Sequence, residues 1–509
     1  MKFNEKTKEK GSVLNHEGAQ AYAMSPEMEL YSAVVTSSMS DNFYETDKER
    51  TNRILELVEK VDHRFVAQLA VYTRSEMNLR SVPIFLVVAL AGVHSGDDLV
   101  SRTVARVVQR ADEITELLAC YQKMNPTGDK TKKLARVSNQ ILKGLRAAFN
   151  KFDEYQFAKY NRDGAEVKLR DALFLSHPKA KDAEQQAVFD KIVTDSLATP
   201  YTWETELSEL GKSQFSDETE RNAAFAHKWE ELVESRRMGY MATLRNLRNM
   251  LSLDVAEQTM ESVCRYLANP VAVRKSRQLP FRFLAAYREM KAFGDKAVSV
   301  NEALEKAVVA STENIRGFDV GTRVLLACDV SGSMQRGVSP RSSVMNYDIG
   351  LMLAMLLRSR CKNVVTGLFG DVWKPVLLPD SQILKSVDEL YKREGEVGYS
   401  TNGHKVIDWL LKNQTVMDKV LIFTDCQMWN SNDYYNNGAM MKKSWMAYKE
   451  IAPKAKLYLF DLAGYGCTPL SIERSDVFLI AGWNERVFEV LQAIENGSEA
   501  LELIKAVEI

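Results

Sequence analysis

Residues 323–334 read Arg-Val-Leu-Leu-Ala-Cys-Asp-Val-Ser-Gly-Ser-Met, an apolar run that ends abruptly in small polar residues. The apolar part, 323–328, is typical of a buried parallel strand. Asp329, Ser331 and Ser333 follow it, and ligands of an open α/β sheet bind outside the carboxyl ends of its strands. Carboxylate and hydroxyl oxygens are hard ligands that suit Mg²⁺ or Mn²⁺. The stretch therefore predicts a metal site, although a serine-rich turn without a ligand gives the same local pattern.

Two further stretches supply matching side chains. Residues 419–425, Lys-Val-Leu-Ile-Phe-Thr-Asp, predict a second buried strand that ends in Asp425, and residues 398–403 form a loop that contains Thr401. Together with the first stretch they resemble the metal-ion-dependent adhesion site of von Willebrand factor A domains. The resemblance implies that Ser331, Ser333 and Thr401 contact a divalent metal ion, Mg²⁺ before Mn²⁺. It also implies that Asp329 and Asp425 act through bound water.

The rest of the C-terminal region alternates between strand and helix patterns, which predicts a mostly parallel, doubly wound α/β sheet. The expected strands are 323–329, 363–370, 374–378, 419–425, 456–462 and 477–481. The expected helices are 345–360, 382–391, 404–412, 440–451 and 485–506.

The N-terminal region reads as helix after helix from about residue 25 to about residue 310, following a polar lead-in arm over 1–20. Breakers such as Asn125-Pro126 and Thr199-Pro200 separate the helices. An all-helical region of this length predicts an α-solenoid of stacked helix pairs with irregular repeats. We therefore expect two domains, 1–318 and 319–509.

Composition limits the class of protein. The chain has 509 residues, 45% of them hydrophobic, and a formal net charge of -1, so any surface for nucleic acid must be a local patch. Its six cysteines are scattered without a C-x-x-C pair, as expected in a reducing compartment. The N-terminus lacks an apolar signal core, and the apolar run 84–93 is too short to span a membrane. These features predict a cytoplasmic protein.

Charge is unevenly distributed in the helical region. Residues 236–253 and 262–288 contain no acidic residue, but they contain several arginines with interleaved aromatic residues. Arginines meet phosphates and aromatic rings stack on bases, so such stretches indicate a surface for single-stranded nucleic acid. The alternative is that the arginines are solvated helix faces and the aromatic residues are core. The RNA-binding candidates from this pattern are Arg236, Arg245, Arg248, Arg274 and Arg277.

The helical region also resembles the TROVE module of the Ro autoantigen family. The stretches that carry the resemblance are 15–22, 25–31, 43–44, 79–83, 169–179, 241–250 and 276–284. They occur in the family's order, and an A domain follows them as it does in that family. The resemblance covers essentially the whole chain and indicates a bacterial-type Ro protein.

This resemblance implies a fold and a function. The fold is an all-α ring of HEAT-like repeats closed by the A domain. The function is RNA binding: small noncoding Y RNAs on the outer surface, and single-stranded 3′ ends of misfolded RNA in a central hole. Lys159, Arg162 and His177 match the family's Y RNA contacts, although the spacing around 161–166 departs from the family pattern. Bacterial relatives act with exoribonucleases, so we expect such a partner for this protein. We also expect the protein to be a monomer.

No catalytic motif accompanies these features, and the predicted metal site lacks a general base, so we expect no enzyme activity. Two functions from different classes remain open. The first is an RNA scaffold for quality control. The second is a metal-dependent docking protein that binds an acidic residue of a partner at the A-domain metal.

Overall fold

The computed structural model describes residues 12–37, 39, 44–126, 136–161, 164–313, 315–338, 342–379, 382–429 and 439–509. By internal contacts the chain divides into two compact units. One unit contains residues 1–54 and 261–501, and the other contains residues 55–260 and 502–509. The first unit therefore combines the N-terminal segment with the sheet domain, although the two are far apart in the sequence.

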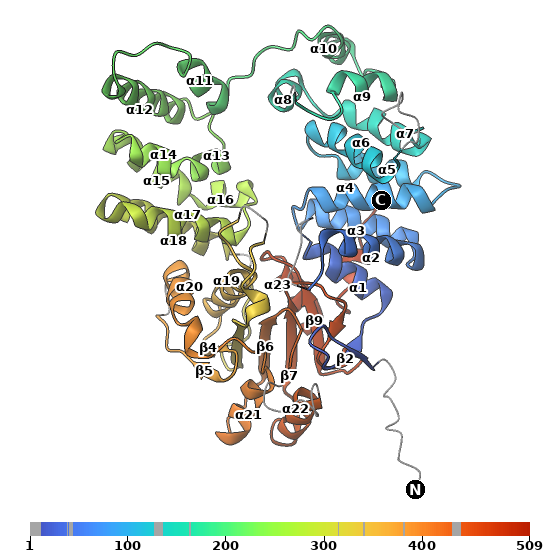
Figure 1. Ribbon diagram of the computed structural model, residues 1–509, viewed down its shortest axis with the longest axis vertical. Helices are drawn as coiled ribbons and strands as arrows, with labels where there is room; N and C mark the ends of the chain where they lie inside the picture. The colour runs from blue at the N-terminus through green and yellow to red at the C-terminus, as the bar shows by residue number, and fades with distance from the viewer. Residues whose placement is uncertain are drawn as a thin grey trace. The chain divides into compact units, whose positions relative to one another are not determined.

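A six-stranded sheet forms the centre of the first unit, with the strand order β5-β4-β3-β6-β7-β9 (Figure 1). All neighbours are parallel except β5, which is antiparallel to β4. The strands are β3 (Arg323–Asp329), β4 (Asn363–Phe369), β5 (Trp373–Pro375), β6 (Lys419–Thr424), β7 (Lys456–Asp461) and β9 (Val477–Ala481). The predicted von Willebrand factor A-like sheet is confirmed.

Helices cover both faces of this sheet, because alternate residues of its strands are apolar and buried. On one face, Leu325 and Ile422 belong to a core that includes Ile407 of α21 (His404–Lys412) and Trp445 of α22 (Ala439–Ile451). On the other face, α19 (Asn346–Arg358) packs on β3 and β6. Helices α20 (Ile383–Lys392) and α23 (Val487–Glu495) complete the domain. The arrangement is doubly wound, as predicted.

An N-terminal hairpin is the main departure from the sequence prediction, which placed a polar arm over 1–20. Strands β1 (Ser12–Leu14) and β2 (Gln20–Ala23) pair with each other, and β2 also pairs with β8 (Cys467–Thr468). These strands are too short to show a readable alternation of apolar and polar residues. Helix α1 (Pro26–Val35) follows the hairpin and is attached to the sheet by a hydrogen bond from the Ser32 hydroxyl to Asp461 of 2.5 Å.

Between residue 257 and β3 the first unit contains α15 (Glu257–Leu267), whose first residues belong to the other unit, α16 (Pro270–Ser276), α17 (Pro280–Met290) and α18 (Val298–Ser311). Arg288 attaches α17 to α19 through an ion pair with Asp348, 2.7 Å long. A second ion pair joins Lys291, just after α17, to Asp388 of α20. The helical segment and the sheet domain thus share one compact unit.

The second unit is helical, which confirms the predicted helical-repeat region. Its helices are α2 (Asp47–Lys60), α3 (His63–Ser75), α4 (Ser81–Val93), α5 (Leu99–Val107), α6 (Asp112–Met124), α7 (Asn139–Phe149), α8 (Glu154–Tyr160), α9 (Leu169–Ser176), α10 (Ala183–Val193), α11 (Trp203–Leu210), α12 (Glu218–Glu234), α13 (Tyr240–Arg245), α14 (Leu247–Ser252) and α24 (Glu502–Lys505). The first residues of α2 belong to the other unit.

Consecutive and alternate helices of this unit pack on one another, as α3 does on α4 and α5, and as α5 does on α7. The C-terminal region shows a second departure, because the single helix expected over 485–506 is two helices. The second of these, α24, packs on α3 within the helical unit. Gln68 fixes this contact with hydrogen bonds to the carbonyls of Lys505 and Val507, 2.5 and 3.0 Å long.

All six cysteines are free thiols, as the scattered spacing predicts. No helix in the described part of the chain has the length and apolar character needed to cross a bilayer. The apolar run 84–93 instead lies in α4, where Ile84, Phe85 and Leu86 are buried.

Replacing Ile422 with alanine tests the sheet core, since this β6 side chain is fully buried. Removing it leaves a cavity, and we expect the free energy of unfolding of the sheet domain to fall by about 3 kcal/mol. Chemical denaturation followed by circular dichroism measures the change. Val309→Ala on α18 is the control, because Val309 is 47% exposed and its truncation leaves no cavity. Equal stability of the two variants would contradict the assignment of Ile422 to the core.

Candidate metal centre and RNA-binding surfaces

Three loops bring the five predicted metal ligands to the carboxyl ends of the sheet strands. Asp329 ends β3 and is followed by Ser331 and Ser333, while Asp425 follows β6 directly. The loop that carries Thr401 is joined to the serine loop by a hydrogen bond from the Gly332 amide to the Tyr399 carbonyl, 3.0 Å long. The Trp429 amide donates to the Thr401 carbonyl at 3.1 Å. We call these five side chains, Asp329, Ser331, Ser333, Thr401 and Asp425, the metal edge.

The metal edge is held by hydrogen bonds that fix Asp329. The Ser331 amide donates to Asp329 Oδ1 at 2.9 Å, and the Thr424 hydroxyl donates to Asp329 Oδ2 at 2.6 Å. The hydroxyl oxygens of Ser331 and Ser333 are 3.3 Å apart. Because both carboxylate oxygens of Asp329 already accept hydrogen bonds, this side chain orients the loop, in keeping with an indirect role at a metal.

Asp425 is different, because one of its oxygens has no partner. The Gln427 amide donates to Asp425 Oδ1 at 3.0 Å, whereas the buried Oδ2 has no hydrogen-bond partner among the described residues. The next residue, Cys426, has a positive φ of 62°, a strained conformation for a non-glycine residue that aims the chain sharply away from the strand. An orphaned buried carboxylate oxygen is costly unless a cation or water satisfies it.

The electrostatics of the metal edge also favour a cation. Burial raises the pKa of both Asp329 and Asp425, and the negative charge of Asp329 raises the pKa of Asp425 further. The Ser333 hydroxyl lowers the pKa of Asp425. No ion pair to either carboxylate occurs in the described part of the chain. The donor set of hydroxyls, carboxylates and one orphaned oxygen therefore fits a hard divalent cation.

Outside the metal edge, the described residues give no support for a second metal site built from His, Cys, Asp or Glu side chains. Across the described ranges no group of three or more His, Cys, Asp or Glu side chains is placed to hold a metal ion. The metal edge contains only two carboxylates, so it does not fall in that class of site.

The residues that match the family's Y RNA contacts are accessible where they can be placed. Lys159 is exposed near the C-terminus of α8, with Nζ 5.7 Å from the centre of the Tyr155 ring and 5.6 Å from that of Tyr160. His177 is exposed directly after α9 in a left-handed conformation with φ 48°, so its imidazole is not a core group. Arg162 lies outside the described residues.

The five candidate arginines are all exposed, but they divide between the two units. Arg236, Arg245 and Arg248 belong to the helical unit, while Arg274 and Arg277 belong to the unit that contains the sheet. Arg274 forms an ion pair with Glu313 of 3.1 Å. The side chains of the other four form no ion pair or hydrogen bond with any residue that the structure describes. Unpaired exposed guanidinium groups are free to meet phosphates.

Two details limit what these stretches offer to RNA. Helices α13 and α14 meet at Asn246, which is buried, and its side-chain amide donates to the Ala242 carbonyl at 2.9 Å. Asn246 therefore lies at the junction of the two helices and does not face solvent. Of the interleaved aromatic residues, Tyr240, Phe281 and Phe283 are buried and pack the core, whereas Tyr266 is exposed and Tyr287 is half-buried, so these two can stack on a base.

Comparison with known proteins decides the family. Residues 24–223 and 196–316 match the TROVE domain, and residues 323–494 match the Ro60 vWA domain. The chain belongs to the Ro family. Membership of this family implies RNA binding, and it agrees with the order of helical region and sheet domain seen in the structure.

Among solved structures, the Ro protein (RSR) of Deinococcus radiodurans has a similar fold, with a TM-score of 0.58 at 19% identity, covering 93% of this chain and 100% of that one. Among curated proteins, telomerase protein component 1 of Mus musculus is 38% identical over 91 residues, 18% of this chain. The same component of Rattus norvegicus is 22% identical over 335 residues, 51% of this chain. These matches span 3% and 12% of the two telomerase components.

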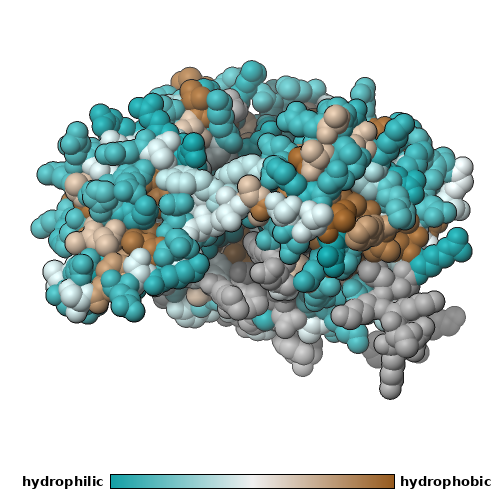
Figure 2. Space-filling model, turned by 90° about the horizontal axis from the view of Figure 1, so that it is seen from above, coloured by the Kyte–Doolittle hydropathy of each residue, from teal (hydrophilic) through white to brown (hydrophobic). Residues whose placement is uncertain are grey.

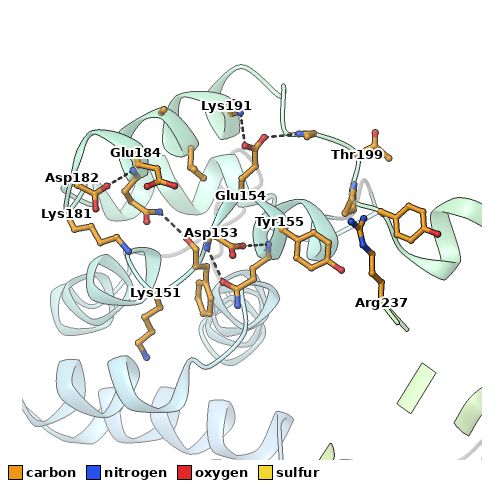
Figure 3. Close-up of a pocket in the computed structure, with 18 residues that line it drawn as sticks. Lys151, Asp153, Glu154, Tyr155, Lys181, Asp182, Glu184, Lys191, Thr199 and Arg237 are labelled. Atoms are coloured by element: carbon orange, nitrogen blue, oxygen red, sulfur yellow. Dashed lines mark hydrogen bonds and ion pairs between the residues drawn. The ribbon is translucent and has the colours of Figure 1, made fainter. Parts of the chain in front are cut away.

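A large open pocket in the helical unit of this Ro protein has a volume of about 990 Å³. Figure 3 shows it between α8, α10 and the segment before α11. Of the cations that line it, Lys191 pairs with Glu154 at 2.7 Å, and Arg237 lies 5.0 Å from the centre of the Tyr201 ring. Figure 2 shows a largely hydrophilic face with small, separate hydrophobic patches.

Replacing Asp425 with asparagine removes one of two buried like charges. At pH 8 in EDTA we expect a higher unfolding midpoint for the variant than for the wild type. Saturating Mn²⁺ should stabilise the wild type by about 2.7 kcal/mol at a hundredfold excess over Kd, and the variant far less. Asp319→Asn, at an exposed position before β3, is the charge-matched control. An equal response to Mn²⁺ in the Asp425 variant would remove this residue from the metal edge.

Proposed function

We propose that this protein is an RNA scaffold for noncoding RNA quality control, maturation or decay. It binds a small structured Y-type RNA on the outer surface that includes Lys159 and His177. It binds single-stranded 3′ ends of misfolded RNA through its arginine-rich stretches, in the central hole that the family resemblance implies. The observation that carries the proposal is the set of exposed, unpaired arginines in a member of the Ro family.

The charge pattern supports this proposal in physical terms. Some exposed arginines elsewhere in the chain pair with acids, as Arg102 does with Asp98 at 2.9 Å and Arg323 does with Asp418 at 2.8 Å. Arg236, Arg245 and Arg248 instead lie in a stretch without acidic residues. A cation with no protein partner can neutralise a phosphate and release the counterions condensed on the RNA, so its contribution to binding depends strongly on salt.

We further propose that the metal edge binds a divalent cation, Mg²⁺ in preference to Mn²⁺. Ser331, Ser333 and Thr401 would contact it directly, with Asp329 and Asp425 acting mainly through water. The cation would supply positive charge that neutralises the two buried carboxylates. This role is structural, and no enzyme activity is part of the proposal.

The alternative of a metal-dependent docking protein is less well supported. A carboxylate from a partner must reach the metal, but each of the five side chains of the metal edge is at most 5% exposed. The scaffold proposal includes an exoribonuclease that meets this protein through its bound RNA. It places both in the cytoplasm, with the Ro protein as a monomer.

The triple variant Arg236→Ala, Arg245→Ala, Arg248→Ala tests the arginine surface. We expect its affinity for single-stranded RNA to fall at least tenfold. We also expect the slope of log K against log salt to become shallower by about 2, because roughly 0.7 counterions are released per phosphate contact. Filter binding over a KCl series measures both quantities.

The matched control removes three arginines that form ion pairs, through Arg102→Ala, Arg323→Ala and Arg393→Ala. It carries the same loss of charge and should bind RNA nearly as the wild type does. If both triple variants lose affinity equally, net charge alone accounts for binding and the arginine surface is rejected.

The double variant Lys159→Ala, His177→Asn tests the Y-type RNA surface. Asparagine tolerates the left-handed backbone of His177 and removes only the imidazole. Sequencing the RNA that copurifies from the native host should show one abundant small structured RNA with the wild type, and at least tenfold less with the variant. Lys60→Ala with His227→Asn, at exposed positions of α2 and α12, is the control. A background of random fragments that moderate salt removes would favour the docking alternative.

A further inference from the structure

The metal edge is reached by a segment that neither the strand ends nor the A-domain resemblance indicates: the N-terminal hairpin and the residue Tyr44. The Asn15 side-chain Nδ2 donates to the Met428 carbonyl at 2.8 Å, and the His16 backbone amide donates to the Gln427 Oε1 at 2.9 Å. Gln427 belongs to the loop that begins with Asp425. The loop that presents the orphaned carboxylate therefore also holds the hairpin.

Aromatic contacts fix Tyr44 at the same place. The His16 ring stacks on the Tyr44 ring, with centroids 5.2 Å apart and an angle of 7° between the planes. Tyr465, from the loop after β7, meets the Tyr44 ring edge-on at 5.4 Å. Two segments that are distant in the sequence, the hairpin and the loop after β7, thus hold one tyrosine near the metal edge.

The Tyr44 hydroxyl connects the metal edge to a carboxylate. It donates its proton to Glu17 Oε1, and the Ser333 side chain lies beside it. A phenol has one proton, and here that proton points to Glu17, so the Tyr44 oxygen can only accept a hydrogen bond from the metal edge. Tyr44 thus joins Glu17 to the side of the metal edge that carries Ser333.

This arrangement brings a third negative charge, that of Glu17, close to an edge that has only two carboxylates of its own. Partners beyond the direct ligands commonly orient a ligand and strengthen its binding to metal. We name Asn15, His16, Glu17 and Tyr44 the N-terminal clasp.

We propose that Glu17, acting through the Tyr44 hydroxyl on Ser333, is a positioning residue for the cation of the metal edge, and that cation binding is coupled to docking of the N-terminal clasp. The inference rests on the metal proposed above and deepens it. By linkage, whatever the clasp adds to cation affinity, the cation adds to clasp docking.

The first test compares Mn²⁺ affinity by isothermal titration calorimetry in the full-length chain. We expect Glu17→Gln and Tyr44→Phe each to weaken binding at least tenfold, the range seen for residues that support metal ligands. Glu27→Gln on α1 is the control for charge, since it lies on the same N-terminal segment without contacting the metal edge. Unchanged affinity in both clasp variants overturns the proposal, even if the wild type binds Mn²⁺ tightly.

The second test uses the unmodified protein, so it does not depend on the folding of a variant. Hydrogen exchange of residues 12–23 is measured with EDTA and with saturating Mn²⁺. Coupling predicts exchange at least tenfold slower with the metal in the wild type, and a much smaller effect in Glu17→Gln. Tight Mn²⁺ binding with no change in exchange overturns the clasp alone. A wild type that binds no Mn²⁺ overturns the metal proposal and the clasp together, while leaving RNA binding untouched.

Discussion

Two buried carboxylates at the ends of neighbouring parallel strands, Asp329 and Asp425, impose the constraint on which this end of the sheet depends. Parallel pairing of β3 with β6 brings them together, and burial removes the water that would screen them. Their charges must then be balanced by hydrogen bonds, by protons or by a cation. Thr424, the Ser331 amide and the Gln427 amide supply the hydrogen bonds, and one carboxylate oxygen still lacks a partner. The surrounding loops therefore balance part of the charge of these two carboxylates through hydrogen bonds.

The same need explains why the first unit joins segments from both ends of the chain. The hairpin, α1 and Tyr44 all attach to loops at the carboxyl edge of the sheet. Ser32 and two backbone amides bond Asp461, a third buried aspartate at the end of β7. Arg50 and Arg53 bond the carbonyls of Ala463 and Gly464 in the following loop. The N-terminal segment of the TROVE match therefore contributes structurally to the domain that follows it.

How much the sequence could predict depends on the range of the interactions involved. The strand 419–424 and the position of Asp425 follow from a long apolar run and need no information from elsewhere. The hairpin could not be predicted, because β1 and β8 have three and two residues and their pairing is set by distant contacts. The clasp is hidden for the same reason, since no spacing rule relates Glu17 to Ser333. The burial of Tyr240 and Phe283 could not be predicted from the sequence either. An aromatic residue beside an arginine gives the same sequence pattern in a core helix and at an RNA-binding surface.

The pairing of β2 with β8 joins Tyr22 to Thr468. A ribosome releases Tyr22 early and Thr468 late, so the N-terminal hairpin has no sheet edge to join until most of the chain has been made. Contacts of such long sequence separation form slowly, because a large loop must close first. During synthesis the hairpin and the apolar face of α1 therefore remain without their partners, and completion of this end of the sheet is expected to be a late event in folding.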